Sequence, residues 1–163
     1  SPHRIGDDTR MGSTGWWAFV GICFLVSLSG AVFKPGDWYA RLRKPRWRPP
    51  NWLFGPAWAV LYIMIATAGF YVWEAEGAGL ALGVYAVQLL FNAAWSGLFF
   101  GLRRPDIGFY GLVALWLSIL GCIILFAPVS ATAMWLMVPY LAWVSFAGVL
   151  NWTLWQMNGA RPA

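Results

Sequence analysis

Apolar residues follow one another along the chain in five long segments, separated by short breaks rich in proline, glycine or charge. The segments cover approximately Trp16–Phe33, Trp52–Trp73, Gly79–Leu102, Asp106–Ala127 and Ala131–Met157. Each is close to the ~20 residues that a helix needs to cross a bilayer, and none has Lys or Arg in its interior. The pattern predicts an all-α membrane protein, a single-domain bundle of five transmembrane helices over residues 11–163.

The breaks have the chemistry of helix ends. They are Lys34-Pro35-Gly36, Gly77-Ala78-Gly79, Arg103-Arg104-Pro105 and Pro128-Val129-Ser130. Pro105 suits the first turn of the fourth helix, and Ser130 suits the N-cap of the fifth. We interpret the polar residues 1–10, which hold the only histidine, as the remnant of an expression tag, with Met11 the native start.

Composition excludes several classes of protein. Hydrophobic residues make up 60% of the 163 residues and charged residues only 10%, where a soluble domain carries roughly 25% charge. A soluble enzyme, a nucleic-acid binder and a disordered chain are therefore not expected. Cys23 and Cys122 lie in apolar runs and are expected to be buried hydrophobes, and without histidine they cannot form a zinc site.

The basic residues lie on one side of the predicted bundle. They are Lys34, Arg41, Arg43, Lys44, Arg46 and Arg48 after the first helix, Arg103 and Arg104 after the third, and Arg161 after the fifth. The positive-inside rule then places these loops and the C-terminus in the cytoplasm and the N-terminus outside. A bacterial-type envelope fits this arrangement, and the choice between inner and outer membrane stays open.

The first loop is long, basic and stiffened by prolines, and it carries Trp38, Tyr39 and Trp47. Two interpretations are open. The loop forms an interfacial belt, with aromatic rings at headgroup depth and arginines on phosphates, or it forms a structured lid over the bundle. A lid of this kind would offer flat aromatic faces and cations to a flat, apolar, anionic ligand.

Helical spacing gives an independent route to a binding pocket. In the fifth segment every fourth residue is taken to share one inward face, namely Pro139, Trp143, Ala147, Asn151 and Trp155. Similar faces are expected in the second segment (Trp58, Tyr62, Ile65, Gly69, Trp73) and in the third (Gln88, Asn92, Trp95, Ser96, Phe99). Polar side chains avoid lipid, so Gln88 and Asn92 should point into the bundle. Their role is either interhelical hydrogen bonding or lining of a pocket.

Four ordered motifs carry a resemblance to a known family. They are Trp38-Tyr39-x4-Lys44-Pro45-x-Trp47-x-Pro49-Pro50, Phe54-x-Pro56-x-Trp58-x2-Leu61-Tyr62, Gln88-Leu89-x2-Asn92-x2-Trp95-x3-Phe99-Phe100 and Pro139-Tyr140-x2-Trp143-x3-Ala147-x3-Asn151. In these the chain resembles the TspO/MBR family of tryptophan-rich sensory proteins, translocator proteins and peripheral benzodiazepine receptors. The resemblance implies five transmembrane helices, a homodimer, and binding of porphyrins, sterols and benzodiazepine-site ligands.

The resemblance also implies roles for particular residues. Trp58, Asn92, Trp143 and Ala147 fall at ligand-lining positions, and Trp38, Tyr39, Pro49 and Trp95 match weaker members of that set. Tyr62 joins them by its helical spacing. Arg41, Arg43, Arg46 and Arg48 are candidates to pair with porphyrin carboxylates. No cofactor is expected to be obligatory, and a porphyrin would be held iron-free, by stacking.

The third segment has a second face made of small residues, comprising Gly83, Ala86, Leu90, Ala93, Gly97 and Gly101. Such surfaces let helices approach closely, either inside one protomer or between two. The resemblance favours a homodimer seam at this face.

Three functions are then open: a membrane receptor or sensor for tetrapyrroles linked to regulation of their metabolism, a transporter of porphyrin or sterol, and an enzyme. The stretch Val149–Trp155 lacks the Tyr and the base of a sterol-recognition pattern, which puts sterol binding in doubt. No intramembrane charge is present to couple transport, and no acid–base or nucleophile set supports catalysis. Any enzyme activity would be light- and oxygen-dependent porphyrin degradation, with Trp58 and Trp143 beside the ring.

Overall fold

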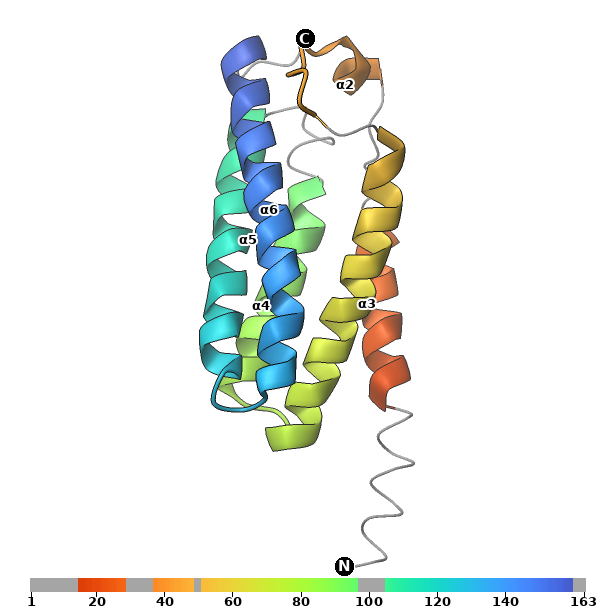
Figure 1. The fold of residues 1–163 in the computed structure, drawn as a ribbon, viewed down its shortest axis with the longest axis vertical. Helices are drawn as coiled ribbons and strands as arrows, with labels where there is room; N and C mark the ends of the chain where they lie inside the picture. The colour runs from red at the N-terminus through yellow and green to blue at the C-terminus, as the bar shows by residue number, and fades with distance from the viewer. Residues whose placement is uncertain (1–14, 29–36, 49–50, 97–104, 160–163) are drawn as a thin grey trace, which may run out of the picture.

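The computed structural model describes residues 15–28, 37–48, 51–96 and 105–159, and every regular element within them is helical. The helices are an N-terminal helix (Gly15–Leu28), the short α2 (Asp37–Arg41), α3 (Asn51–Glu76), α4 (Leu80–Ser96), α5 (Pro105–Phe126) and α6 (Ala131–Asn158). Apart from α2 they run along one long axis, and α2 lies beside the C-terminal end of α6 (Figure 1).

Three helices are long and apolar enough to cross a membrane: α3, α5 and α6. The N-terminal helix and α4 are shorter apolar helices as far as they are described. Their expected continuations, to Phe33 and Leu102, lie outside the described residues, as do residues 1–10. The prediction of membrane-spanning helices is therefore confirmed for three of the five segments.

The described helix ends follow the chemistry expected from the sequence. α5 begins at Pro105, and α6 begins directly after Ser130, whose Oγ accepts a hydrogen bond from the Ala133 backbone N–H at 3.2 Å. α3 ends before Gly77, which has a positive φ of 72° that glycine adopts without steric cost. The breaks at residues 34–36 and 103–104 lie outside the described residues.

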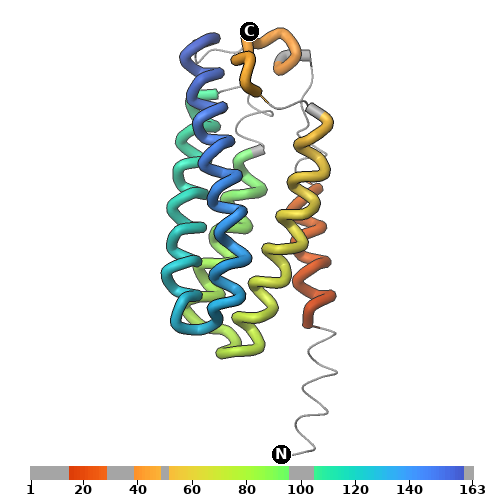
Figure 2. Tube along the Cα trace, in the orientation of Figure 1, coloured from red at the N-terminus to blue at the C-terminus, as the bar shows by residue number. Residues whose placement is uncertain are grey.

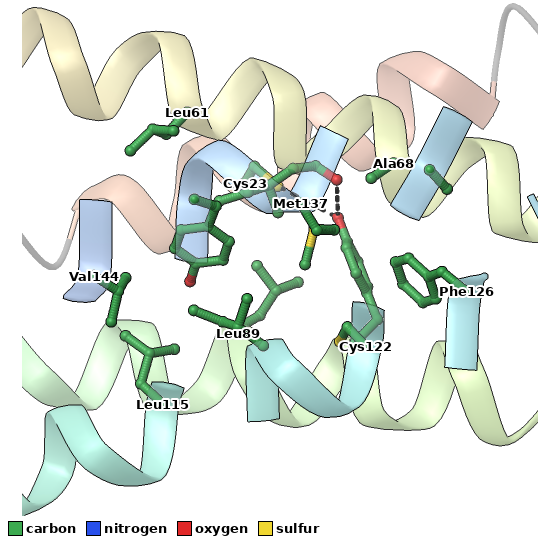
Figure 3. Packing of buried hydrophobic residues seen from close by; sticks show 14 of the residues in the cluster. Cys23, Leu61, Ala68, Leu89, Leu115, Cys122, Phe126, Met137 and Val144 are labelled. Carbon is green, nitrogen blue, oxygen red and sulfur yellow. Dashed lines mark hydrogen bonds between the residues drawn. The ribbon is translucent and has the colours of Figure 1, made fainter. Parts of the chain in front are cut away.

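The long helices pack through buried apolar side chains. α5 contacts both α4 and α6, and α6 also contacts α3. The N-terminal helix lies next to α3 in the tube view (Figure 2), and its Trp16 donates an indole hydrogen bond to Thr67 at 3.1 Å. Figure 3 shows Cys23 and Cys122 packed with Phe126 and Met137. Both cysteines are free and buried, which confirms their prediction as small hydrophobes.

Tyr85 of α4 contacts both α3 and the N-terminal helix. Its hydroxyl donates to the Ile65 carbonyl of α3 at 2.8 Å and lies 3.7 Å from Cys23 Sγ of the N-terminal helix. Its ring lies so close to Gly69 that a Cβ on that residue would be 2.4 Å from Tyr85 Cζ. Glycine at position 69 is therefore a packing requirement of the α3–α4 contact.

Candidate functional site

Five aromatic side chains from α3 and α6 meet within the half of the bundle nearer α2. The rings of Trp58 and Trp143 are perpendicular, with centroids 6.3 Å apart. Phe54 and Phe146 lie 5.6 and 5.9 Å from Trp143, and Tyr62 lies 5.6 Å from Trp58. We call these five residues the aromatic cluster. The structure thus brings together Trp58, Tyr62 and Trp143, which the sequence predicts to share a pocket.

A chain of hydrogen bonds continues from this cluster into the core. The Tyr62 hydroxyl donates to Asn92 Oδ1 at 2.5 Å, Asn92 Nδ2 donates to the Tyr140 hydroxyl at 2.7 Å, and that hydroxyl donates to Gln88 Oε1 at 2.8 Å. We call these four residues the polar chain. Gln88 and Asn92 are only 0% and 4% exposed, which confirms their predicted inward orientation. The Tyr140 ring also lies 6.3 Å from Trp58, so chain and cluster are contiguous.

Two buried polar atoms have no hydrogen-bond partner among the residues that the structure describes: Gln88 Nε2 and Trp143 Nε1. Buried donors are nearly always satisfied by protein, water or ligand, because leaving one unpaired costs roughly 1–3 kcal/mol. One of the two atoms belongs to the aromatic cluster and the other ends the polar chain. The site is therefore suited to a flat apolar molecule that carries a hydrogen-bond acceptor.

Trp95 and Ala147 border this region from α4 and α6. Ala147 is buried one turn beyond Trp143. The Trp95 indole donates to Asn151 Oδ1 at 3.3 Å, and Asn151 Nδ2 donates to the Pro105 carbonyl at 2.8 Å. Asn151 thereby ties α4, α5 and α6 together, and the Trp95 indole N–H is used inside the protein.

The predicted inward face of α6 is wrong at Pro139, which is exposed. At its other end the half-buried Trp155 ring packs against Phe109 and Tyr110 of α5, with centroids 6.1 and 5.9 Å apart. A strict four-residue step drifts by about 40° each time on a helix with about 3.6 residues per turn. The observed buried face instead alternates steps of three and four, over Met137, Tyr140, Val144, Ala147, Asn151 and Leu154.

Because the prediction stepped by four residues, it left Tyr140 out of the site. Tyr140 is the residue of the polar chain that bonds to both Asn92 and Gln88. The alternating three- and four-residue pattern through Met137 and Val144 would have placed it on the inward face. On α3, Trp73 is likewise exposed, whereas Ile65 and Gly69 are buried as expected.

Residues 37–48, which we call the loop segment, pack against the C-terminal half of α6. Tyr39 and Leu42 are buried against Leu150 and Leu154. Burial raises the pKa of the Tyr39 phenol above its ordinary value, and the positive charge of Arg48 offsets part of that rise. Trp47 reaches the aromatic cluster, with its ring 5.8 Å from that of Phe146.

An asparagine side chain fastens the loop segment to the end of α6. The Arg43 backbone N–H donates to Asn158 Oδ1 at 2.7 Å, and Asn158 Nδ2 donates back to the Arg43 carbonyl at 2.8 Å. The same amide also donates to the Leu154 carbonyl at 2.9 Å. Asn158 therefore satisfies both backbone groups of Arg43 as a neighbouring strand would.

Replacing Asn158 by alanine is expected to speed hydrogen exchange at the Arg43 amide about fivefold, because one net hydrogen bond is lost there. Asn158→Asp keeps the acceptor oxygen but places a second oxygen where the amide donates to the Arg43 and Leu154 carbonyls, so it should restore only part of the protection. Thr153→Ala is the matched control, since the Thr153 hydroxyl donates to the Val149 carbonyl of its own helix at 2.8 Å. Unchanged exchange in Asn158→Ala would show that the loop segment is held by its apolar contacts alone.

The four arginines predicted to contact a ligand differ in how exposed they are. Arg41, Arg43 and Arg46 are exposed and Arg48 is half-buried, so three guanidinium groups lie on the outer surface of the loop segment. Pro49 and the side chain of Trp38 lie outside the described residues. The structure thus places Tyr39 in the contact between loop and α6, and leaves the carboxylate-binding role of the arginines a prediction.

The described part of the small-residue face of α4 is largely exposed. Gly83, Ala86 and Leu90 are exposed, with Leu90 70% exposed, and Ala93 is half-buried. A Cβ on Gly83 would meet nothing within 4 Å. Gly97 and Gly101 lie outside the described residues. Among the described residues, the other helices of the same chain therefore do not bury Gly83, Ala86 and Leu90.

Fold and site together define an integral-membrane helical protein with an aromatic and hydrogen-bonding interior. The TspO/MBR family model matches residues 19–156. The chain is 42% identical over 146 residues to tryptophan-rich protein TspO of Chlorobaculum tepidum, covering 85% of this chain and 92% of the relative. It is 43% identical over 145 residues to protein CrtK of Rhodobacter capsulatus, covering 86% and 91%.

A mammalian relative shows the same extent of similarity. The translocator protein of Bos taurus is 38% identical over 157 residues, covering 90% of this chain and 93% of the relative. The chain therefore belongs to the TspO/MBR family, which confirms the resemblance seen in the four motifs.

Proposed function

We propose that this protein is a membrane receptor or sensor that binds protoporphyrin IX-type tetrapyrroles, and benzodiazepine-site ligands, between α3, α4 and α6 beneath the loop segment. Membership of a family whose members are named sensory and translocator proteins supports a ligand-responsive role. Through this response the protein would take part in regulating tetrapyrrole metabolism. No obligatory cofactor is part of the proposal, and sterol binding is not included in it.

The aromatic cluster is the observation that carries this proposal. Perpendicular Trp58 and Trp143 rings give a flat macrocycle one face to stack on and one edge to meet. The unpartnered Trp143 indole N–H supplies a donor beside them. The exposed guanidinium groups of Arg41, Arg43 and Arg46 lie on the loop segment, where they could pair with propionates that project from the pocket.

Replacing Trp143 by phenylalanine is expected to weaken protoporphyrin IX binding about tenfold, since it removes an indole ring contact and a hydrogen-bond donor. The affinity is measured by titrating porphyrin into detergent-solubilised protein and following the shift of the porphyrin absorption band. Trp135→Phe on the same helix is the control, because Trp135 is 65% exposed. Equal affinities for the two variants would contradict the proposed site.

We further propose that all five apolar helices cross the membrane, with the loop segment, the α4–α5 connection and the C-terminus on the cytoplasmic side of a bacterial-type envelope. The support is that every base outside residues 1–10 lies in one of these three regions, except Lys34, which comes just before the loop segment in the sequence. The acidic residues Glu74 and Glu76 lie at the C-terminal end of α3, which is the end farther from the loop segment in the sequence.

The exposed small-residue face of α4 supports a homodimer through that helix. Replacing Gly83 and Ala86 together by leucine is expected to yield monomers, because close helix approach needs small side chains. Mass measurement by light scattering in detergent gives the result directly. Gly21→Leu on the N-terminal helix is the control, since a Cβ there also meets nothing within 4 Å. A double variant that stays dimeric would rule out this interface.

A further inference from the structure

The hydrogen bonds of the polar chain all point the same way. Starting at Tyr62, each residue donates to the next, through Asn92 and Tyr140, and the chain ends at Gln88 Oε1. Because the Tyr62 hydroxyl donates its proton to Asn92, its oxygen can only accept a hydrogen bond from a neighbouring ligand. At the far end Gln88 Nε2 has no partner in the described part of the chain.

Every member of this chain can reverse its direction without moving far. A hydroxyl donates or accepts by rotating its proton, and an amide exchanges donor and acceptor by a half-turn. In the reversed chain Gln88 donates to Tyr140, Tyr140 to Asn92, and Asn92 to Tyr62. The Tyr62 proton is then released to point at a ligand.

Gln88 makes these two directions comparable in energy. In either direction it completes the bond to Tyr140 with one end of its amide and leaves the other end unpaired. A side chain that could only accept would hold the observed direction. With a side chain that has neither group, each direction keeps two hydrogen bonds and leaves one hydroxyl proton unpaired, at Tyr140 in the observed direction and at Tyr62 in the reversed one. Only the Tyr62 proton can be paired by a ligand beside the aromatic cluster, so such a side chain favours ligands that carry an acceptor.

We propose that Gln88 is a positioning residue that lets the Tyr62 hydroxyl act as either acceptor or donor toward a ligand in the aromatic cluster. The inference rests on the proposed function, because it assumes a ligand beside Trp58 and Tyr62. Its consequence is a site that takes flat aromatic molecules carrying an N–H donor and equally those carrying a carbonyl acceptor. Gln88 acts on the ligand only through Tyr140, Asn92 and Tyr62.

Three flat tricyclic probes of the same shape test this directly. Carbazole presents an N–H donor at the position where 9-fluorenone presents a carbonyl acceptor, and fluorene presents neither. The native protein should bind carbazole and 9-fluorenone both roughly fivefold more tightly than fluorene, the ratio that one net hydrogen bond gives. Affinities are measured by quenching of tryptophan fluorescence in detergent.

Gln88→Met should separate the two polar probes. The advantage of 9-fluorenone over fluorene should rise, because its carbonyl pairs a Tyr62 proton that would otherwise be unpaired. The advantage of carbazole should stay near fivefold, because the carbazole and fluorene complexes each leave one hydroxyl proton unpaired. Gln88→Glu should keep the native ratios, because a glutamic acid kept neutral by burial can accept from Tyr140 or donate to it. Gln156→Met, at an exposed position near the end of α6, is the matched control. If Gln88→Met does not fold, Gln88→Leu carries the same expectation.

The possible failures are distinguishable. General structural damage would weaken all three probes in proportion, and a Gln88→Met variant with unchanged ratios among them would overturn the inference. If protoporphyrin IX binds but neither polar probe exceeds fluorene in the native protein, the inference fails and the proposed function stands. If neither porphyrin nor any probe binds, the proposed function fails and the inference with it.

Discussion

Replacing Gly69 by alanine is expected to lower the stability of the bundle by about 2 kcal/mol, the middle of the range for overpacking. The new Cβ would lie 2.4 Å from Tyr85 Cζ and 2.6 Å from its hydroxyl oxygen. The ring cannot move away without breaking its 2.8 Å hydrogen bond to the Ile65 carbonyl. A single methyl group would therefore separate α3 from α4.

Thermal unfolding in detergent measures this effect, and two companion variants make it specific. Gly21→Ala, on the N-terminal helix, adds the same methyl where nothing lies within 4 Å, and it should be neutral or slightly stabilising, since alanine favours a helix over glycine. In a Tyr85→Ala background, Gly69→Ala should have almost no further cost. An equal cost with and without the Tyr85 ring would show that the contact is not the cause.

Replacing Asn92 by alanine is expected to lower protoporphyrin IX affinity about tenfold and stability by about 1–2 kcal/mol. Asn92 is the only residue of the polar chain that bonds both to the aromatic cluster, through Tyr62, and to the core, through Tyr140. Without it the Tyr62 hydroxyl loses its acceptor and the Tyr140 hydroxyl keeps only its bond to Gln88, and Tyr62 is no longer held beside Trp58.

Ser145→Ala is the matched control for Asn92→Ala. The Ser145 hydroxyl accepts a 2.8 Å hydrogen bond from the Trp116 indole, between α5 and α6, on the exposed side of the bundle. Its loss should lower stability without changing porphyrin affinity. Absorption titration and thermal unfolding of the two variants separate these effects. If both variants lose affinity equally, Asn92 acts through general stability and not at the site.

Much of the fold could be predicted because its signals are local. Apolar length fixes α3, α5 and α6, and the starts at Pro105 and Ser130 follow from helix-end chemistry. Burial of Gln88 and Asn92 could be predicted because polar groups are costly in lipid. None of these inferences needs to know which helices are neighbours.

The site was predicted less completely because its contacts depend on helix rotation and on pairing. Stepping by four residues along α6 led away from Tyr140, which lies on the buried face and joins Asn92 to Gln88. The link between Asn158 and Arg43 spans 115 residues and has no periodic signal in the sequence. Tyr85 against Gly69 depends in the same way on how α3 and α4 meet.

A porphyrin bound against Trp143 would change the indole N–H resonance of that residue. Each tryptophan gives one such signal in a proton–nitrogen NMR spectrum, and Trp143→Phe and Trp135→Phe assign the two that matter. On addition of protoporphyrin IX we expect a large shift of the Trp143 signal and an unchanged Trp135 signal. Binding of porphyrin with the Trp143 signal unmoved would contradict the proposed site.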